Sequence, residues 1–231
     1  MSNWHRAFHQ AAAAIRANLL PGLLLQCLLL IFFSAYVAHE GTRAFLGDIA
    51  HIKEEAGYLF SFVCYVASSA LLPEILRIAF FQNGRPAWRN LRLFLTAAPA
   101  WGCLGMLVDL FYRCQAGWFG TGNDLMTILP KVAVDQLLYA PFLANPIAIA
   151  WFIWRDEGFR RSAWPKIFYS GFFMERVFSV QVSSWIVWVP GVALVYFMPP
   201  HLQIPVAVFV QTFWVLIFTT LGQGANGERE L

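Results

Sequence analysis

Residues 184–214 read SWIVWVPGVALVYFMPPHLQIPVAVFVQTFW, and they contain no charged side chain. Pro199 and Pro200 divide this stretch into two apolar halves, because proline lacks a backbone N–H and disfavours helical backbone in the residue before it. A helix of roughly 20 apolar residues crosses the hydrocarbon core of a bilayer. The stretch is therefore predicted to form a tight hairpin of two membrane-spanning helices.

The composition of the whole chain extends this prediction. Of its 231 residues, 59% are hydrophobic and 13% are charged, whereas in soluble domains about a quarter are charged. The chain has room for several spans and little besides, which excludes a soluble catalytic domain. Its formal net charge of +3 is small and dispersed, so nucleic acid is not an expected partner, because proteins that bind it cluster basic residues on one face.

Six apolar segments predict an all-α, polytopic helix bundle whose main partner is the lipid bilayer. The segments are Leu19–His39, Gly57–Phe81, Leu91–Tyr112, Val132–Trp154, Phe168–Met198 and His201–Leu221. The fifth exceeds one span, so residues 164–175 are expected at the interface, before a span from Val177 to Met198. Residues 1–231 are predicted to be a single membrane domain, in which residues 1–56 supply an interfacial helix, an extra span and a loop, and residues 57–231 supply the helical core.

The N-terminal residues are predicted to form a short interfacial helix that leads into the first span. Residues 1–20 contain no acidic side chain, and Trp4, Phe8, Ile15 and Leu19 recur at helical spacing. A secretory signal is the competing interpretation. The tract HEGTRAF at residues 39–45 lacks a small-residue cleavage site, which argues against it.

Basic residues concentrate in the segments that would lie on one side of the membrane. These residues are Arg6, Arg16, Arg85, Arg89, Arg92, Arg155, Arg160, Arg161, Lys166 and Arg229. Short loops on the cytoplasmic side carry an excess of Lys and Arg. Both termini are therefore predicted to face the cytoplasmic or matrix-type side.

The fourth segment carries the strongest candidate for a functional site. Lys131, Asp135, Leu138, Phe142 and Asn145 follow one another at steps of three and four, which predicts one shared helix face. Charged side chains inside a span are costly and normally face the bundle interior or a wet cavity. Polar residues also recur on other segments, namely Glu74, Arg77, Asp109, Gln181, Ser184, Gln203 and Gln211.

Two interpretations of this segment remain open. Pro141 and Pro146 each remove a backbone hydrogen bond, so the fourth helix is predicted to be kinked, and a carbonyl freed in this way is tolerated where it lines a solute path. Alternatively, Lys131 and Asp135 form an ion pair that locks helix packing, and the prolines only shape the bundle.

Signatures of enzymes and metal sites are missing from the sequence. It contains no HExxH, no GxSxG and no P-loop. All of the histidines lie outside or at the edges of the apolar segments, and the four cysteines lack metal-ligand spacing. We therefore predict no catalytic residue, no metal and no cofactor, and we interpret most of the ten tryptophans as membrane anchors.

Two stretches resemble the Mpv-seventeen family, which includes the twenty-two-kilodalton peroxisomal membrane protein and mitochondrial inner-membrane relatives. KVAVDQLLYAP at residues 131–141 matches the family's Lys-x-x-x-Asp-Gln-x-x-x-x-Pro through Lys131, Asp135, Gln136 and Pro141. The hairpin stretch matches its C-terminal pattern through a second set of residues. These are Trp185, Trp188, Pro190, Pro200 and Trp214.

The resemblance implies a weakly selective channel for small solutes in an organellar membrane, and a homo-oligomer is an expected assembly. Asp135 and Lys131 would set the charge of the path, Gln136 would bridge helices, and Pro141 would kink the lining helix that also carries Asn145. The C-terminal tryptophans and prolines would pack the hairpin.

The family is described with four spans, so the first span here would be an addition. Val192 stands where the family has Gln, which would narrow the path. The alternative is a non-conducting structural or assembly protein.

Overall fold

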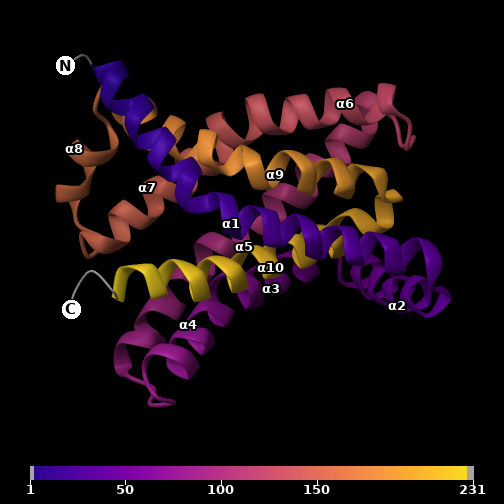
Figure 1. The fold of residues 1–231 in the computed structure, drawn as a ribbon, viewed down its shortest axis with the longest axis horizontal. Helices are drawn as coiled ribbons and strands as arrows, with labels where there is room; N and C mark the ends of the chain where they lie inside the picture. Colours follow the sequence, from indigo (N-terminus) through magenta and orange to yellow (C-terminus); the bar gives the residue numbers. More distant parts are fainter. Residues whose placement is uncertain (1–2, 228–231) are drawn as a thin grey trace.

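A computed structural model describes residues 3–227, including the side chains of residues 19–217 apart from Ser179 and Ser183. Its regular structure is entirely helical within that range (Figure 1). Five helices are long and apolar enough to cross a membrane, and the bent pair Phe173–Val182 and Ser184–Phe197, which meet at 55°, brings the number of crossings to six when it is counted as one span. The predicted all-α helix bundle of a multi-pass membrane protein is confirmed.

The helical elements follow the predicted segments closely. The first two are α1 (Asn3–Ala38) and α2 (Glu40–Ala56). The second crossing is a continuous series of α3 (Tyr58–Val66), η1 (Ala67–Leu71), α4 (Leu72–Leu76) and η2 (Arg77–Phe81). The third crossing is α5 (Trp88–Phe119), and the fourth comprises α6 (Leu125–Val134), η3 (Asp135–Ala144) and α7 (Asn145–Asp156).

The C-terminal part begins with two short helices, η4 (Arg161–Ala163) and α8 (Trp164–Ile167). The fifth crossing joins η5 (Phe173–Phe178) to α9 (Ser179–Phe197), and the sixth is α10 (Pro200–Gly227). Pro200 opens α10 directly after the break that the sequence predicts, so the helical hairpin is present. Of the η elements, η4 is a 3₁₀-helix and the other four are π-helical.

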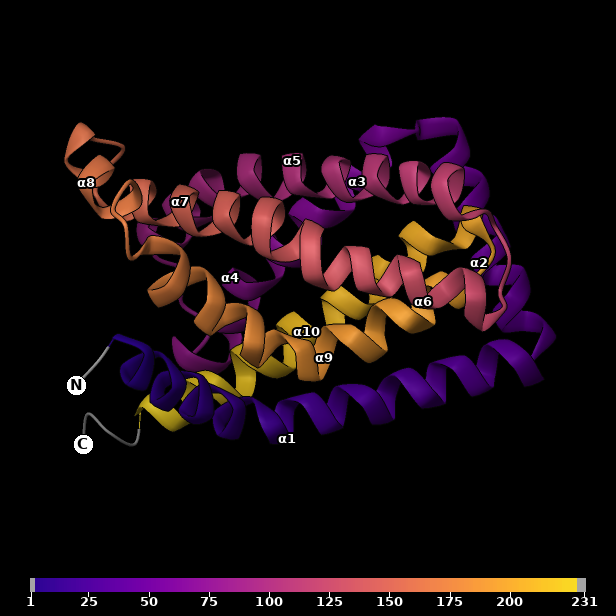
Figure 2. The same ribbon diagram turned by 90° about the horizontal axis from the view of Figure 1, so that it is seen from above.

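The helices lie roughly along one long axis (Figure 2). Asn3 and Gly227 lie at the same end of the bundle as α8, and α2 lies at the opposite end (Figures 1 and 2). This arrangement agrees with six crossings, in which the bent pair counts as one span. Which membrane face each end occupies remains a prediction.

The core lies where α1 packs against the C-terminal hairpin. α1 contacts both α9 and α10, and Leu25, Val187, Val206 and Val210 are fully buried between them. The Gln26 amide also donates a hydrogen bond to the Val187 carbonyl at 3.1 Å. The N-terminal span is therefore an integral part of the bundle, because it covers the hairpin.

Close contact between α3 and α5 depends on glycine. A Cβ atom at Gly105 would lie 2.6 Å from both the Ser61 carbonyl oxygen and the Tyr65 ring. Small residues permit such close helix approach inside membranes. Gly105 therefore sets the distance that brings Ser61 and Tyr65 into the interior.

Three segments differ from expectation. Residues 40–56, expected as a loop, form α2, because an amphipathic pattern buries Leu46 and Ala50. α1 is continuous, so the predicted interfacial helix and first span are one helix; its side chains before Leu19 lie outside the described ones. The fifth crossing is helical from Phe173 rather than Val177.

Candidate functional site

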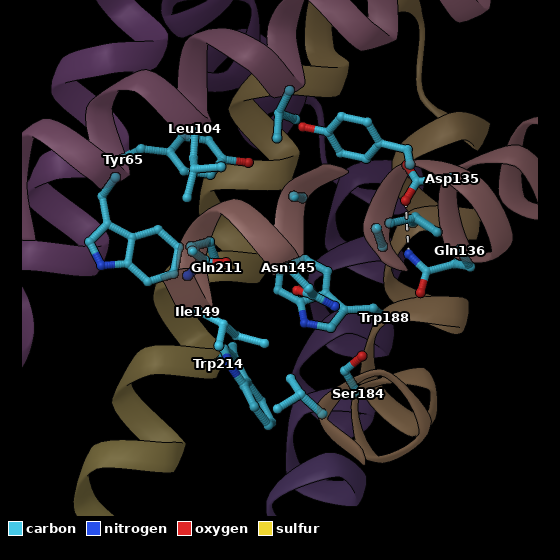
Figure 3. A pocket seen from close by; sticks show the side chains of 18 of the residues that line it. Tyr65, Leu104, Asp135, Gln136, Asn145, Ile149, Ser184, Trp188, Gln211 and Trp214 are labelled. Atoms are coloured by element: carbon cyan, nitrogen blue, oxygen red, sulfur yellow. Dashed lines mark hydrogen bonds between the residues drawn. The ribbon is translucent and has the colours of Figure 1, made fainter. Parts of the chain in front are cut away.

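A cavity of about 420 Å³ lies inside the bundle, lined by residues of α3, α5, η3, α7, α9 and α10. Figure 3 shows Asp135 and Gln136 on one side of this cavity and Tyr65 on the other. Trp101 and Tyr112 both line it from α5, and their separation in sequence corresponds to about 16 Å along a helix. The cavity therefore extends along about three turns of α5.

The helix that lines this cavity is π-helical over residues 135–144. The Asn145 N–H bonds the Ala140 carbonyl, five residues earlier, which is the spacing of a π-helix. Pro141 has no N–H to offer the corresponding carbonyl, that of Gln136. This freed carbonyl instead accepts hydrogen bonds from the Gln181 amide at 3.2 Å and the Trp185 indole N–H at 3.1 Å.

The π-helix overturns the prediction that five residues share one face. Leu138 and Phe142 are 56% and 64% exposed and point away from the interior. A π-helix has more residues per turn than an α-helix, so steps of three and four do not stay in register. Tyr139 takes the interior position instead, and it lines the cavity with its ring stacked on Phe111 at 4.0 Å.

Asp135 is 4% exposed, and its carboxylate is held by neutral donors. The Tyr196 hydroxyl donates to Oδ2 at 2.6 Å, and the Gln136 amide donates to Oδ1 at 2.8 Å. The Gln115 amide in turn donates to the Tyr196 hydroxyl at 3.0 Å. Among the described side chains, no Lys, Arg or His nitrogen lies within 4.0 Å of this carboxylate.

Lys131 is 1% exposed but does not line the cavity. Its Nζ lies 5.7 Å from the centroid of the Tyr196 ring, and it makes no ion pair with Asp135 within 4.0 Å. The interpretation in which Lys131 and Asp135 form a locking ion pair is therefore wrong. The two oxygens of Asp135 are occupied by Tyr196 and Gln136, and Lys131 lies against the Tyr196 ring instead.

Neutral polar groups complete the lining. Asn145 donates to the Gln181 side-chain oxygen at 2.6 Å, and Gln211 donates to the Ser69 hydroxyl at 2.9 Å. The Gln136 Oε1 atom and the Tyr139 hydroxyl are buried without a hydrogen-bond partner in the described part of the chain. The lining thus offers polar groups beyond those that hold the helices together.

The structure distributes the predicted site residues over different roles. Asp135, Gln136, Asn145, Trp188 and Trp214 line the cavity. The remaining ones lie elsewhere: Lys131 and Pro141 are buried on the same crossing, Trp185 binds the Gln136 carbonyl, Pro190 lies within α9, and Pro200 begins α10.

Sequence reasoning missed Tyr139 and Tyr196. Tyr196 touches Asp135 across 61 residues of chain, so no local pattern links them. A tyrosine inside an apolar span is a usable signal, because its buried hydroxyl needs a partner.

A second buried carboxylate, Asp109, has a different environment. It is 1% exposed, and Oδ1 accepts from the Lys53 ammonium at 3.2 Å and from Arg113 Nε at 2.9 Å. Its Oδ2 accepts from the Ser61 hydroxyl at 2.7 Å. This cluster joins α2, α3 and α5 and lies outside the cavity lining.

Comparisons of the chain with family models, curated proteins and solved structures found no match. No group of three or more His, Cys, Asp or Glu placed to hold a metal occurs among the side chains that the structure describes.

Proposed function

We propose that this multi-pass membrane protein provides a pathway for small solutes, and that its elongated cavity is part of that path. The observation that carries the proposal is Asp135, a buried carboxylate on the cavity wall that has only neutral hydrogen-bond donors. An ionisable side chain within a span is costly, and such residues commonly mark solute or ion routes. At Asp135 no described cation within 4.0 Å offsets this cost.

The backbone around Asp135 supports the same proposal. Non-helical or irregular hydrogen bonding is tolerated at membrane depth where it meets protein or a wet cavity. The freed Gln136 carbonyl meets Gln181 and Trp185, and π-helical turns are frequent at functional sites. Asp135 would set the charge preference of the path, and Tyr196 would hold its carboxylate in place.

The resemblance to the Mpv-seventeen family supplies the class of function, a weakly selective pore in an organellar membrane, with self-association as part of that proposal. The basic end of the bundle, which includes Arg85, Arg155 and Arg161, would face the cytoplasm or matrix. No enzymatic activity is proposed.

The alternative is a non-conducting structural or assembly protein, and the hydrogen bonds of the same residues favour it. Tyr196 ties α9 to Asp135, and Gln181 connects the Gln136 carbonyl with Asn145. Polar contacts of this kind also hold membrane helices together. In that case, Asp135→Ala would lower stability without altering solute flux.

Solute flux through liposomes distinguishes the two functions. Purified full-length protein is reconstituted, and the release of uncharged and charged solutes of graded size is compared among wild type, Asp135→Asn and Glu55→Gln. Glu55 is an exposed carboxylate on α2, so its substitution is the matched control. The proposal expects size-limited release whose charge preference changes in Asp135→Asn alone. Tight liposomes that contain folded wild-type protein would overturn it.

A further inference from the structure

The cavity wall has an unusual combination of one negative charge and many aromatic rings. Asp135 is the sole charged side chain among the described lining residues. Seven lining residues are aromatic, among them Trp101, Phe152, Trp188 and Trp214. Since aromatic faces carry partial negative charge, both features favour a positively charged occupant over an anion.

Positive charges near the cavity are already engaged elsewhere. Lys131 lies against the Tyr196 ring and outside the lining. Arg155 lies over the Phe152 ring at 4.7 Å, but its Nη2 pairs with Asp156 at 2.7 Å. No Lys or Arg therefore faces the cavity among the described residues, so a cation entering it meets Asp135 without a competing ammonium or guanidinium in the wall.

Two lining residues also carry unpartnered polar atoms. The Gln136 Oε1 atom and the Tyr139 hydroxyl oxygen are both buried in residues that line the cavity, and neither has a described partner. Both oxygens can accept a hydrogen bond. A ligand that carries a hydroxyl or ammonium N–H would satisfy both, whereas a carboxylate or phosphate could accept from the Tyr139 hydroxyl but has no hydrogen to donate to the Gln136 oxygen.

The volume of the cavity limits the chemical class of the ligand further. Its volume of about 420 Å³ is at the lower end of the range of about 300–1,000 Å³ for small-molecule sites. Quaternary ammonium groups are recognised by aromatic side chains that surround the cation. A small organic amine or quaternary ammonium compound matches the volume, the aromatic walls and the single carboxylate together.

We propose that the cavity binds a small organic cation, with Asp135 as its counter-ion and the surrounding tryptophan rings, including Trp188, as its aromatic wall. This inference rests on the proposed function, because it takes the solute pathway as the site and assigns its preferred class of solute. It goes beyond that function because it requires saturable binding. It also requires that the cavity distinguish a cation from an uncharged molecule of the same shape.

Choline and its uncharged isostere 3,3-dimethyl-1-butanol provide the test. Equilibrium binding of radiolabelled choline to the full chain in lipid nanodiscs is measured, with the isostere as competitor. We expect saturable choline binding that the isostere fails to displace. Asp135→Asn should weaken choline binding more than about tenfold, since it leaves the buried cation unpaired, and Trp188→Leu should weaken it several-fold. Glu55→Gln, outside the cavity, should bind as wild type does.

A second variant tests the site without changing Asp135, whose substitution could itself unfold the protein. Ala148 lines the cavity from α7, and Ala148→Leu adds apolar volume there without removing any of the hydrogen bonds of Asp135. Loss of choline binding in folded Ala148→Leu places the ligand in the cavity. Unchanged binding in that variant, or equal binding of choline and the isostere, would overturn the inference.

The flux assay separates this inference from the function on which it rests. Release of small uncharged solutes with no saturable choline binding would overturn the organic-cation site while leaving the pathway intact. Choline binding by protein whose liposomes stay tight would support the site and remove the pathway.

Discussion

Asp109 and Asp135 are buried to a similar degree, 1% and 4% exposed, yet they are stabilised in opposite ways. Asp109 has two cations, Lys53 at 3.2 Å and Arg113 at 2.9 Å. Asp135 has a tyrosine hydroxyl and an amide. Burial alone therefore does not distinguish a structural carboxylate from a functional one inside a membrane. The charge of its hydrogen-bond partners distinguishes them.

The locations of the two carboxylates agree with this division. Lys53 and Arg113 reach Asp109 from α2 and from one turn along α5, and the Arg113 side chain is 52% exposed. The cluster joins α2 to the bundle at one end. Asp135 instead lies on a cavity wall with no neighbouring cation, so its charge is available to a ligand.

The largest effect is expected when the charge of Asp109 is removed. Asp109→Asn leaves the buried ammonium of Lys53, which is 8% exposed, without its counter-ion. Breaking a buried ion pair from one side costs about 3–5 kcal/mol. We expect a loss near that size in the free energy of unfolding, measured by denaturant titration in detergent micelles.

A double substitution tests the reason for this loss. Lys53→Met in the Asp109→Asn background removes the stranded cation and should recover part of the stability. If Asp109→Asn unfolds at the wild-type denaturant concentration, the cluster does not stabilise the end of the bundle.

Asp135→Asn should cost less than Asp109→Asn, because it leaves no cation behind. The amide oxygen of asparagine still accepts from Tyr196, so the loss resembles that of one hydrogen bond to a charged group, about 1.5–3 kcal/mol. The same unfolding measurement on both variants gives the comparison directly. Equal losses would mean that Asp135 is also a structural anchor, and would favour the non-conducting function.

The sequence predicts the spans well because length and hydropathy determine them. The Pro199-Pro200 break, the stretch 184–214 and the other apolar segments are local signals, and the helices begin and end close to them. The helix over residues 40–56 is harder to predict from sequence, because its mean hydropathy is low and it is defined by the buried face of Leu46 and Ala50.

The site was only partly predictable. Asp135, Gln136 and Asn145 line the cavity, but an α-helical period also placed Leu138 and Phe142 on that face. The change to a π-helix depends on partners for the freed Gln136 carbonyl, Gln181 and Trp185, which lie 45 and 49 residues away. No local pattern contains that information. Tyr196 escaped notice for the same reason.

The smallest expected effect concerns Asp124, an exposed carboxylate just before the crossing that contains Asp135. Like Asp135 it has only neutral donors: the Thr127 hydroxyl donates to Oδ2 at 2.8 Å, and the Thr127 N–H donates to Oδ1 at 3.1 Å. The Thr127 hydroxyl, followed by the backbone N–H, lowers the pKa of Asp124. Asp124 thereby caps the N-terminus of α6.

The lowered pKa fixes the direction of the pH effect. A carboxyl group whose pKa is lower in the folded state adds stability above its unfolded pKa of about 4, and loses this contribution as the pH falls through the folded pKa. Thr127→Ala should therefore lower the melting temperature in detergent slightly at pH 7, and the difference from wild type should shrink as the solution is acidified below pH ~4. A difference that stays constant down to low pH would show that Thr127 acts without the Asp124 charge. Water also stabilises the charge of the exposed Asp124 carboxylate, whereas Asp135 lies inside a span and has only its neutral donors, which is why a cationic ligand has more to gain there.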